Sequence, residues 1–190
     1  QPSRVPARVL ERLGGRELGP AGAWARAVEF AVAQGVDAVL LAGDVVEQED
    51  DCHEAYPDLR RGVERLTGAG IRVLGVTGNH DVKVLPRLAE GVPAFELLGA
   101  GGIWQAEVLA GDDGSLVRVL GWSFPEPVVR VSPLASGLPG GDAMPTIGLL
   151  HCDRDQLGSS YAPVRSSELR EAPVDGWLLG HIHKPDDLSG

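Results

Sequence analysis

The sequence has few of the features that mark secreted or membrane proteins. It contains two cysteines in 190 residues, Cys52 and Cys152, which are too few for a disulfide framework. A reducing cytosol is therefore the expected compartment. No apolar run approaches the roughly 20 residues that a membrane-spanning helix needs, and the printed residues contain no basic-then-apolar leader. We expect a cytoplasmic protein with no membrane association.

Positive charge is also scarce. The chain has 17 Lys and Arg residues against 27 Asp and Glu residues, so its formal net charge is -10. Affinity for nucleic acid rises with the number of Lys and Arg contacts to phosphate, and an acidic chain makes few of them. The composition favours a small-molecule substrate, or a nucleic acid that is handled with help. Bound divalent cations would weaken this objection because the ions bring their own positive charge.

The chain begins with Gln1, and its one methionine is Met144. We interpret the sequence as a piece of a longer product that is incomplete at both ends. Its length is within the usual size of one domain. We expect a single domain over residues 1–190.

Amphipathic helices and short apolar strands alternate along the first half of the chain. Helical spacing of apolar residues predicts helices at residues 23–35 and 56–70. Apolar runs predict buried strands at residues 36–44 and 71–81. Alternation of this kind indicates parallel strands in a layered α/β fold.

The middle of the chain has a different pattern. Residues 102–111 and 115–124 alternate apolar and polar side chains around the turn GDDG, which predicts an antiparallel hairpin. A loop rich in Pro and Gly follows. The buried-strand pattern then returns at residues 146–153 and 174–183. We expect one α/β unit with an antiparallel insertion.

Polar side chains follow four of the apolar strands. They are Asp44, the run Asn79-His80-Asp81, His151, and the pair His181 and His183. The carboxyl ends of parallel strands meet at one edge of a sheet, where ligands bind in open α/β folds. Carboxylate oxygen, amide oxygen and imidazole nitrogen suit Zn, Mn or Fe, and the set lacks the thiolates of a structural zinc site. Each residue alone has an ordinary explanation as a turn, cap or loop residue, but four of the five histidines follow apolar strands.

These motifs resemble, in order and approximate spacing, those of the calcineurin-like metallophosphoesterase superfamily. The matching segments are GD at residues 43–44, GNHD at residues 78–81, His151, and GHIH at residues 180–183. The resemblance extends from about residue 22 to the end. It implies an α/β fold, a layered sandwich of mixed β-sheets flanked by helices. It also implies a metal-dependent phosphoesterase, a hydrolase acting on phosphate esters.

Three longer phrases look like the DNA-repair exonuclease branch of this superfamily, typified by the SbcD nuclease subunit. They are GWSFPEP, IGLLHCD and YAPVRSSELREAPVDGWLLGHIHKP. This finer resemblance implies an exonuclease that hydrolyses phosphodiester bonds in DNA. The net charge of -10 predicts weak DNA affinity from this domain alone, so that an ATPase partner subunit or a homodimer would help to hold DNA. The alternatives are a small-molecule phosphomonoesterase or cyclic-nucleotide phosphodiesterase on the same fold, or a non-catalytic relative that lacks one metal site.

The resemblance also implies a role for each polar residue after the strands. Asn79, His151 and His181 would hold one of two divalent ions, Asp44 would bridge both ions, and His183 would reach the other. Manganese is the expected metal, with zinc, iron or magnesium as alternatives.

By the same resemblance, His80 is the catalytic general acid. Its neighbour Asp81 would either orient the His80 imidazole or cap a helix. The family's first motif, Asp-x-His on the first strand, does not occur before Asp44. Either that strand is missing from a fragment, or the protein is a degraded relative with one metal or none.

Other reactive or charged residues receive ordinary interpretations. The acidic run at residues 46–54, which includes His53, is expected to be a solvated loop. Cys152 is expected to be buried and not nucleophilic.

Three arginines, Arg60, Arg61 and Arg65, share one predicted helix. They form either a small basic strip for DNA or an ordinary solvated helix face.

Overall fold

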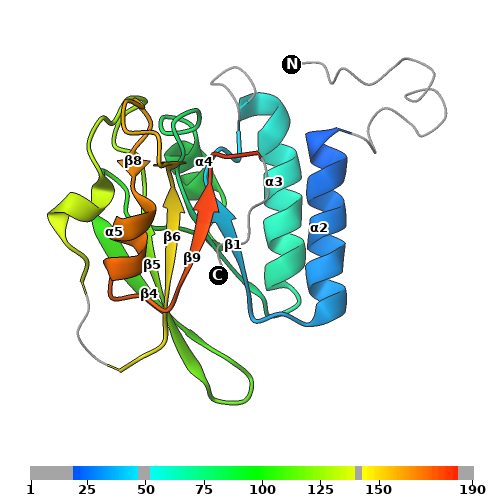
Figure 1. The fold of residues 1–190 in the computed structure, drawn as a ribbon. Helices are drawn as coiled ribbons and strands as arrows, with labels where there is room; N and C mark the ends of the chain where they lie inside the picture. Colours follow the sequence, from blue (N-terminus) through cyan, green and yellow to red (C-terminus); the bar gives the residue numbers. More distant parts are fainter. Residues whose placement is uncertain (1–18, 47–51, 140–142, 184–190) are drawn as a thin grey trace.

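The computed structural model describes residues 19–46, 52–139 and 143–183 (Figure 1). In this part of the chain the helices are α2 (Pro20–Gln34), α3 (Cys52–Thr67), α4 (Leu85–Gly91) and α5 (Ser166–Glu171), with a 3-10 turn η2 (Pro133–Ser136). The strands are β1 (Ala38–Ala42), β2 (Arg72–Val76), β3 (Phe95–Leu97), β4 (Trp104–Ala110), β5 (Leu116–Trp122), β6 (Thr146–His151), β7 (Asp153–Arg154), β8 (Pro163–Val164) and β9 (Gly176–Gly180).

The described strands form two larger sheets and one small sheet. The first has the order β1-β2-β3 and is parallel. The second has the order β4-β5-β6-β9, with an antiparallel β4–β5 pair and parallel pairing elsewhere. Strands β7 and β8 pair separately. This mixed arrangement confirms the predicted α/β class, and β1, β6 and β9 point in the same direction (Figure 1).

The two larger sheets lie between helices, so that apolar side chains are buried in three layers. Val73 of β2 packs with the helices α2, α3 and α4, whereas Leu74 and Val76 of the same strand pack between the sheets. In β6, Leu149 belongs to the layer between the sheets and Leu150 packs on the side of α5. Burial on both faces explains why these strands are continuously apolar in sequence.

The bounds of the two long helices follow from local chemistry. Helix α2 has proline in its first turn and ends at Gly35, whose φ of 61° is in the left-handed region that closes helices. Helix α3 begins at Cys52, four residues before the predicted start at Tyr56. The expectation of a loop up to residue 54 was therefore wrong for the last part of that run. Pro57 near the N-terminal end of α3 removes one helical hydrogen bond, a loss that the amphipathic helix tolerates.

The predicted hairpin is present. Strands β4 and β5 pair antiparallel from Trp104 opposite Trp122 to Ala110 opposite Leu116, with the GDDG turn between them. Because β5 then runs parallel to β6, the hairpin turn lies at the edge of the sheet opposite the end of β6. The polar residues that follow β6 and β9 are therefore at the other end of the molecule from this turn.

Candidate metal centre

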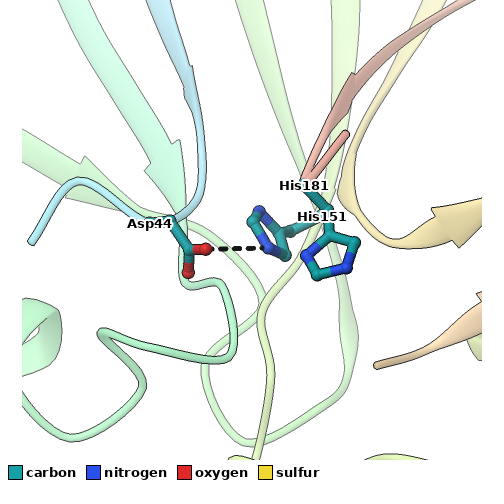
Figure 2. Close-up of side chains that lie close together, drawn as sticks. All are labelled: Asp44, His151 and His181. Atoms are coloured by element: carbon teal, nitrogen blue, oxygen red, sulfur yellow. Dashed lines mark ion pairs between the residues drawn. The ribbon is translucent and has the colours of Figure 1, made fainter. Parts of the chain in front are cut away.

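Gly43 and Asp44 turn the chain sharply after β1. Their φ angles are 82° and 51°, and the second is a conformation that non-glycine residues seldom adopt. A Cβ atom on Gly43 would lie 2.6 Å from His151 Nδ1 and 2.8 Å from the Gly78 nitrogen, so only glycine fits. The turn directs the Asp44 carboxylate to His151, with Oδ2 3.3 Å from Nε2 (Figure 2).

Asn79 approaches the same histidine from the end of β2. Its side chain is 8% exposed, and its Oδ1 lies 3.2 Å from His151 Nε2. The neighbouring position 78 also admits only glycine, because a Cβ atom there would lie 2.1 Å from Asp44 Oδ1. The loops after β1 and β2 are thus packed directly against each other, and both deliver an oxygen to His151.

His151, the last residue of β6, is the centre of the cluster. It is 1% exposed, and its Nδ1–H donates to the Ala42 carbonyl at 2.9 Å. In a neutral imidazole this bond leaves a lone pair on Nε2. That lone pair faces two further acceptors, Asp44 Oδ2 and Asn79 Oδ1. Three converging acceptors repel one another unless a cation lies among them. Without a metal, a proton on Nε2 can fill this place and hydrogen-bond to Asp44. A divalent ion can replace that proton, so these residues fit a metal ion.

His181 completes the cluster from the end of β9. Its ring centroid is 5.1 Å from that of His151, and its φ is 94°. A Cβ on the preceding Gly180 would lie 1.9 Å from the Ala42 oxygen, so glycine allows the ends of β9 and β1 to meet. One ligand atom each from Asp44, His151 and His181 lie within 4.8 Å of one another. The site therefore forms where the edges of the two sheets meet.

The protonation tendencies of the cluster favour cation binding. Burial alone would raise the pKa of the Asp44 carboxyl, but its hydrogen bond to His151, its attraction to that ring and the His80 N–H lower the pKa overall. Burial, and next the charge of His151, lower the pKa of the His181 imidazole. A carboxylate that stays ionised and an imidazole that stays neutral are the forms that bind metals.

Asp81 connects the two loops that carry Asp44 and Asn79. It is fully buried, its Oδ1 accepts the Gly78 N–H at 2.7 Å, and its Oδ2 accepts the Val45 N–H at 2.7 Å. In return, Asp44 Oδ1 accepts the backbone N–H of His80 at 3.1 Å. Each loop thus supplies a carboxylate to the other loop's backbone.

Both interpretations that the sequence suggested for Asp81 were wrong. Its two carboxylate oxygens bind backbone N–H groups and not the His80 imidazole. The N-cap of α4 is Val84, and no side chain caps it. Burial raises the pKa of the Asp81 carboxyl although the two N–H groups oppose the change.

Asp81→Ala should lower metal affinity about 10–100-fold, the range typical of removing a group that positions ligands. It should also destabilise the fold by about 1–3 kcal/mol, because two buried N–H groups lose their acceptor. Calorimetric titration with Mn²⁺ and thermal unfolding measure the two effects. Asp113→Ala, at the exposed hairpin turn, is the matched control. Unchanged affinity in Asp81→Ala would show that the loops keep their arrangement without the carboxylate.

Two residues that the family pattern singles out lie outside this cluster. His80 is exposed at the surface beside Asn79, and only its backbone N–H is bonded to Asp44. His183 is also exposed and is not part of the three-residue group. The role of His80 as general acid and that of His183 at a second ion stay predictions.

The three arginines of α3 do not form a free basic strip. Arg60 pairs with Glu64, Arg61 with Asp58, and Arg65 with Glu29 of α2. Each positive charge therefore has a nearby carboxylate, as on an ordinary solvated helix face.

Cys152 is 1% exposed, and burial raises the pKa of its thiol to about 12. Both facts confirm that it is not a nucleophile.

In the acidic run at residues 46–54, residues 47–51 and the side chain of His53 lie outside the described part of the chain.

Three neighbours of the cluster were not anticipated. Phe124 packs edge-on against the His151 ring with centroids 5.7 Å apart. Tyr161 packs against the His181 ring at 5.4 Å, and Asp153 Oδ2 lies 3.9 Å from His181 Nε2. Phe124 and Tyr161 lie on irregular segments whose position depends on tertiary packing. Asp153 follows His151 by two residues, and this short spacing was a signal in the sequence that could have placed it near the cluster.

The sequence that forms this cluster of Asp, Asn and two His residues at strand ends matches a known family. The model of the family described as "Calcineurin-like phosphoesterase" matches residues 17–185. The chain belongs to this family. The predicted superfamily is thereby confirmed, and calcineurin-like phosphoesterases use divalent metal ions, for which the cluster is suited.

A curated relative supports the same family. It is "Uncharacterized metallophosphoesterase YhaO" of Bacillus subtilis (strain 168), which is 27% identical over 164 residues. The match covers 85% of this chain but 40% of the relative, so this calcineurin-like phosphoesterase chain spans about two fifths of that protein's length. The match to one solved structure covers 87% of this chain and 81% of the other chain, with a TM-score of 0.48 and 10% sequence identity. A likeness this weak adds nothing to the assignment.

In the described residues of this calcineurin-like phosphoesterase, no helix is both long enough and apolar enough to cross a membrane.

Proposed function

We propose that this chain carries the catalytic core of a metal-dependent phosphodiesterase that acts on DNA, an exonuclease of the DNA-repair type with two divalent ions. The observation that carries the proposal is the convergence of Asp44, Asn79 and His181 on the buried His151. Its donor set of one carboxylate, one amide and two imidazoles suits manganese, with zinc or iron as alternatives.

The residues divide into two ligand groups under this proposal. His151, Asn79 and His181 would hold one ion with the Asp44 carboxylate, which would also reach the second ion. His183 would serve that second ion. Divalent ions in such a site neutralise charge on a phosphoryl group and lower the pKa of water, the main requirements of phosphate-ester hydrolysis.

His80 would supply the proton that the leaving oxygen needs. It follows the ligand Asn79 directly, and the bond from its N–H to Asp44 fixes its backbone beside the metal cluster. Its exposed side chain is accessible to a substrate. An imidazole has a pKa near neutrality and is therefore suited to general acid catalysis.

The phrases that resemble the exonuclease branch contribute contacts at the candidate metal centre. The first phrase supplies Phe124, which packs on His151, and the second contains His151 itself. The third supplies Tyr161 and His181, whose rings are in contact. The resemblance to the exonuclease branch therefore involves the groups that surround the cluster. It supports DNA as the substrate more than a resemblance confined to surface residues far from the cluster would.

The charge of the chain supports weak DNA affinity, and it is also the argument for the second candidate. The net charge of -10 and the pairing of the α3 arginines with carboxylates both disfavour phosphate contacts away from the ions. A partner ATPase subunit or a second copy would then supply the basic surface. A small phosphomonoester or cyclic nucleotide needs no such surface, so a phosphatase acting on small molecules is the second candidate.

The Mn²⁺-loaded protein should cleave DNA slowly, and its affinity should fall as salt is raised. Nuclease assays on single- and double-stranded DNA, beside a small phosphomonoester, test this. DNA cleavage that exceeds monoester turnover supports the proposal. Fast turnover of the monoester with both DNAs intact would establish the second candidate. No hydrolysis of any substrate by metal-loaded protein would indicate a non-catalytic relative.

A further inference from the structure

The two metal-binding imidazoles are held in different ways on the side away from the cluster. His151 donates its Nδ1–H to the Ala42 carbonyl, which leaves Nε2 for the ion. For His181, Figure 2 shows one ring nitrogen turned toward Asp44 and His151 and the other turned away. The Nε2 atom of His181 lies 3.9 Å from Asp153 Oδ2, a distance of electrostatic attraction that is longer than a hydrogen bond. A side-chain carboxylate therefore lies on the outer side of the His181 ring, whereas His151 has a hydrogen-bonded backbone carbonyl on that side.

Asp153 is fixed by the short β7–β8 pair. Its N–H donates to the Tyr161 carbonyl at 2.9 Å, and it pairs in register with Pro163. Tyr161 in turn packs its ring on His181, with an angle of 48° between the planes. The side chains of Asp153 and His181 are 14% and 19% exposed, so their interaction is partly shielded from water. The far side of the His181 ring is thus bounded by a carboxylate and an aromatic ring.

His181 needs such support more than His151 does. It follows the end of β9 with a φ of 94°, a conformation that side-chain-bearing residues rarely adopt, so regular strand structure does not position it. A neutral imidazole carries one N–H and one lone pair, and the wrong tautomer presents N–H to the ion. A carboxylate beside Nε2 favours the proton on Nε2 and leaves the lone pair on Nδ1.

We infer that Asp153 is a positioning residue for the metal centre: its carboxylate attracts the Nε2–H of His181 and so favours the tautomer and orientation that present Nδ1 of that imidazole to the ion. The inference rests on the proposed metal centre. It adds a role for a residue that the family motifs do not include, and it assigns the carboxylate an action through His181 and not on the ion directly.

Asp153→Ala should weaken Mn²⁺ binding about 10–100-fold in calorimetric titration, the range typical of losing an outer carboxylate partner. Asp153→Asn should recover part of the loss because its amide oxygen still accepts. Asp112→Ala removes a carboxylate from the hairpin turn at the opposite edge of the sheet, and should bind Mn²⁺ as the wild type does.

A double-mutant comparison separates positioning from general destabilisation. In a His181→Ala background, Asp153→Ala should lower Mn²⁺ affinity by less than about twofold further, because the imidazole through which Asp153 acts is absent. Equal losses in both backgrounds would overturn the inference, since Asp153 would then act without His181. Unchanged affinity of Asp153→Ala in the otherwise wild-type protein would overturn it as well.

Nitrogen-15 NMR of the imidazoles gives a readout that does not depend on activity. In Zn²⁺-loaded wild type, His181 should carry its proton on Nε2, and a proton on Nδ1 would overturn the inference. If the wild type bound no divalent metal at all, the proposed function itself would fail. If the wild type bound metal normally and the Asp153 variants matched it, only the role of Asp153 would fail.

Discussion

Purified His151→Ala protein should lose the bound transition metal that the wild type retains. The Nε2 atom of His151 is within 3.3 Å of both Asp44 Oδ2 and Asn79 Oδ1, so it lies at the centre of the candidate ligands. Removing it should reduce affinity by more than the ~10–100-fold that loss of an outer partner typically costs. Metal analysis after gel filtration, followed by titration with Mn²⁺, measures the loss.

The variant will also be less stable, and the test must separate the two effects. The Ala42 carbonyl loses its donor, a cost of about 1–3 kcal/mol. His151→Gln keeps a side chain that can donate to this carbonyl, so it should fold better and still bind metal poorly. His53→Ala is the matched control for removing a histidine, because the motifs give His53 no ligand role. Metal content equal to wild type in folded His151→Ala protein would remove His151 from the site.

His80→Ala should reduce phosphodiesterase turnover about 10²–10⁴-fold, the usual contribution of general acid–base catalysis. Metal content should stay near the wild-type level, because the backbone N–H of His80 still donates to Asp44. The loss should appear in kcat more than in KM, since the proton is transferred only in the transition state. Steady-state kinetics on a DNA phosphodiester and metal analysis of the same preparation check both statements.

The leaving group offers an internal control for this variant. Hydrolysis of a p-nitrophenyl diester releases p-nitrophenolate, a stable leaving group that needs little protonation. The turnover of this substrate by His80→Ala should therefore fall much less. Lys83→Ala, an exposed change three residues along, should leave both substrates unaffected. An equal loss on both diesters would argue against proton donation by His80. Loss of the metal would instead make His80 a ligand.

Much of the fold was readable from the sequence because its main elements carry complete local signals. The helix ending at Gly35, the GDDG hairpin and the apolar runs of β1, β2, β6 and β9 have periodicity and termini that agree with each other. The short elements α4, β3, β7, β8 and α5 were not anticipated. They are 2 to 7 residues long, too short for a periodic pattern, and they form because the larger sheets and their connections place them.

The residue types of the candidate centre were likewise set by sequence. Asp44, Asn79, His151 and His181 each follow an apolar strand, and Gly43 and Gly180 beside them are required by close backbone contacts. Their positions at the carboxyl ends of predicted parallel strands indicated that these side chains would meet. It did not indicate that they come from two different sheets, with the Ala42 carbonyl of one sheet bonded to His151 of the other.

Only the tertiary structure determined what each supporting group does. The sequence offered two roles for Asp81, and the structure gave it a third, because the loops after β1 and β2 bring two backbone N–H groups to its carboxylate. It also paired the α3 arginines with acids and brought Asp153 and Tyr161 to His181. Strand and motif signals are local, so the sequence by itself specified the candidate ligands. Hydrogen bonds and ring contacts join residues far apart in the chain, so the groups that orient those ligands were decided by the packing of the two sheets.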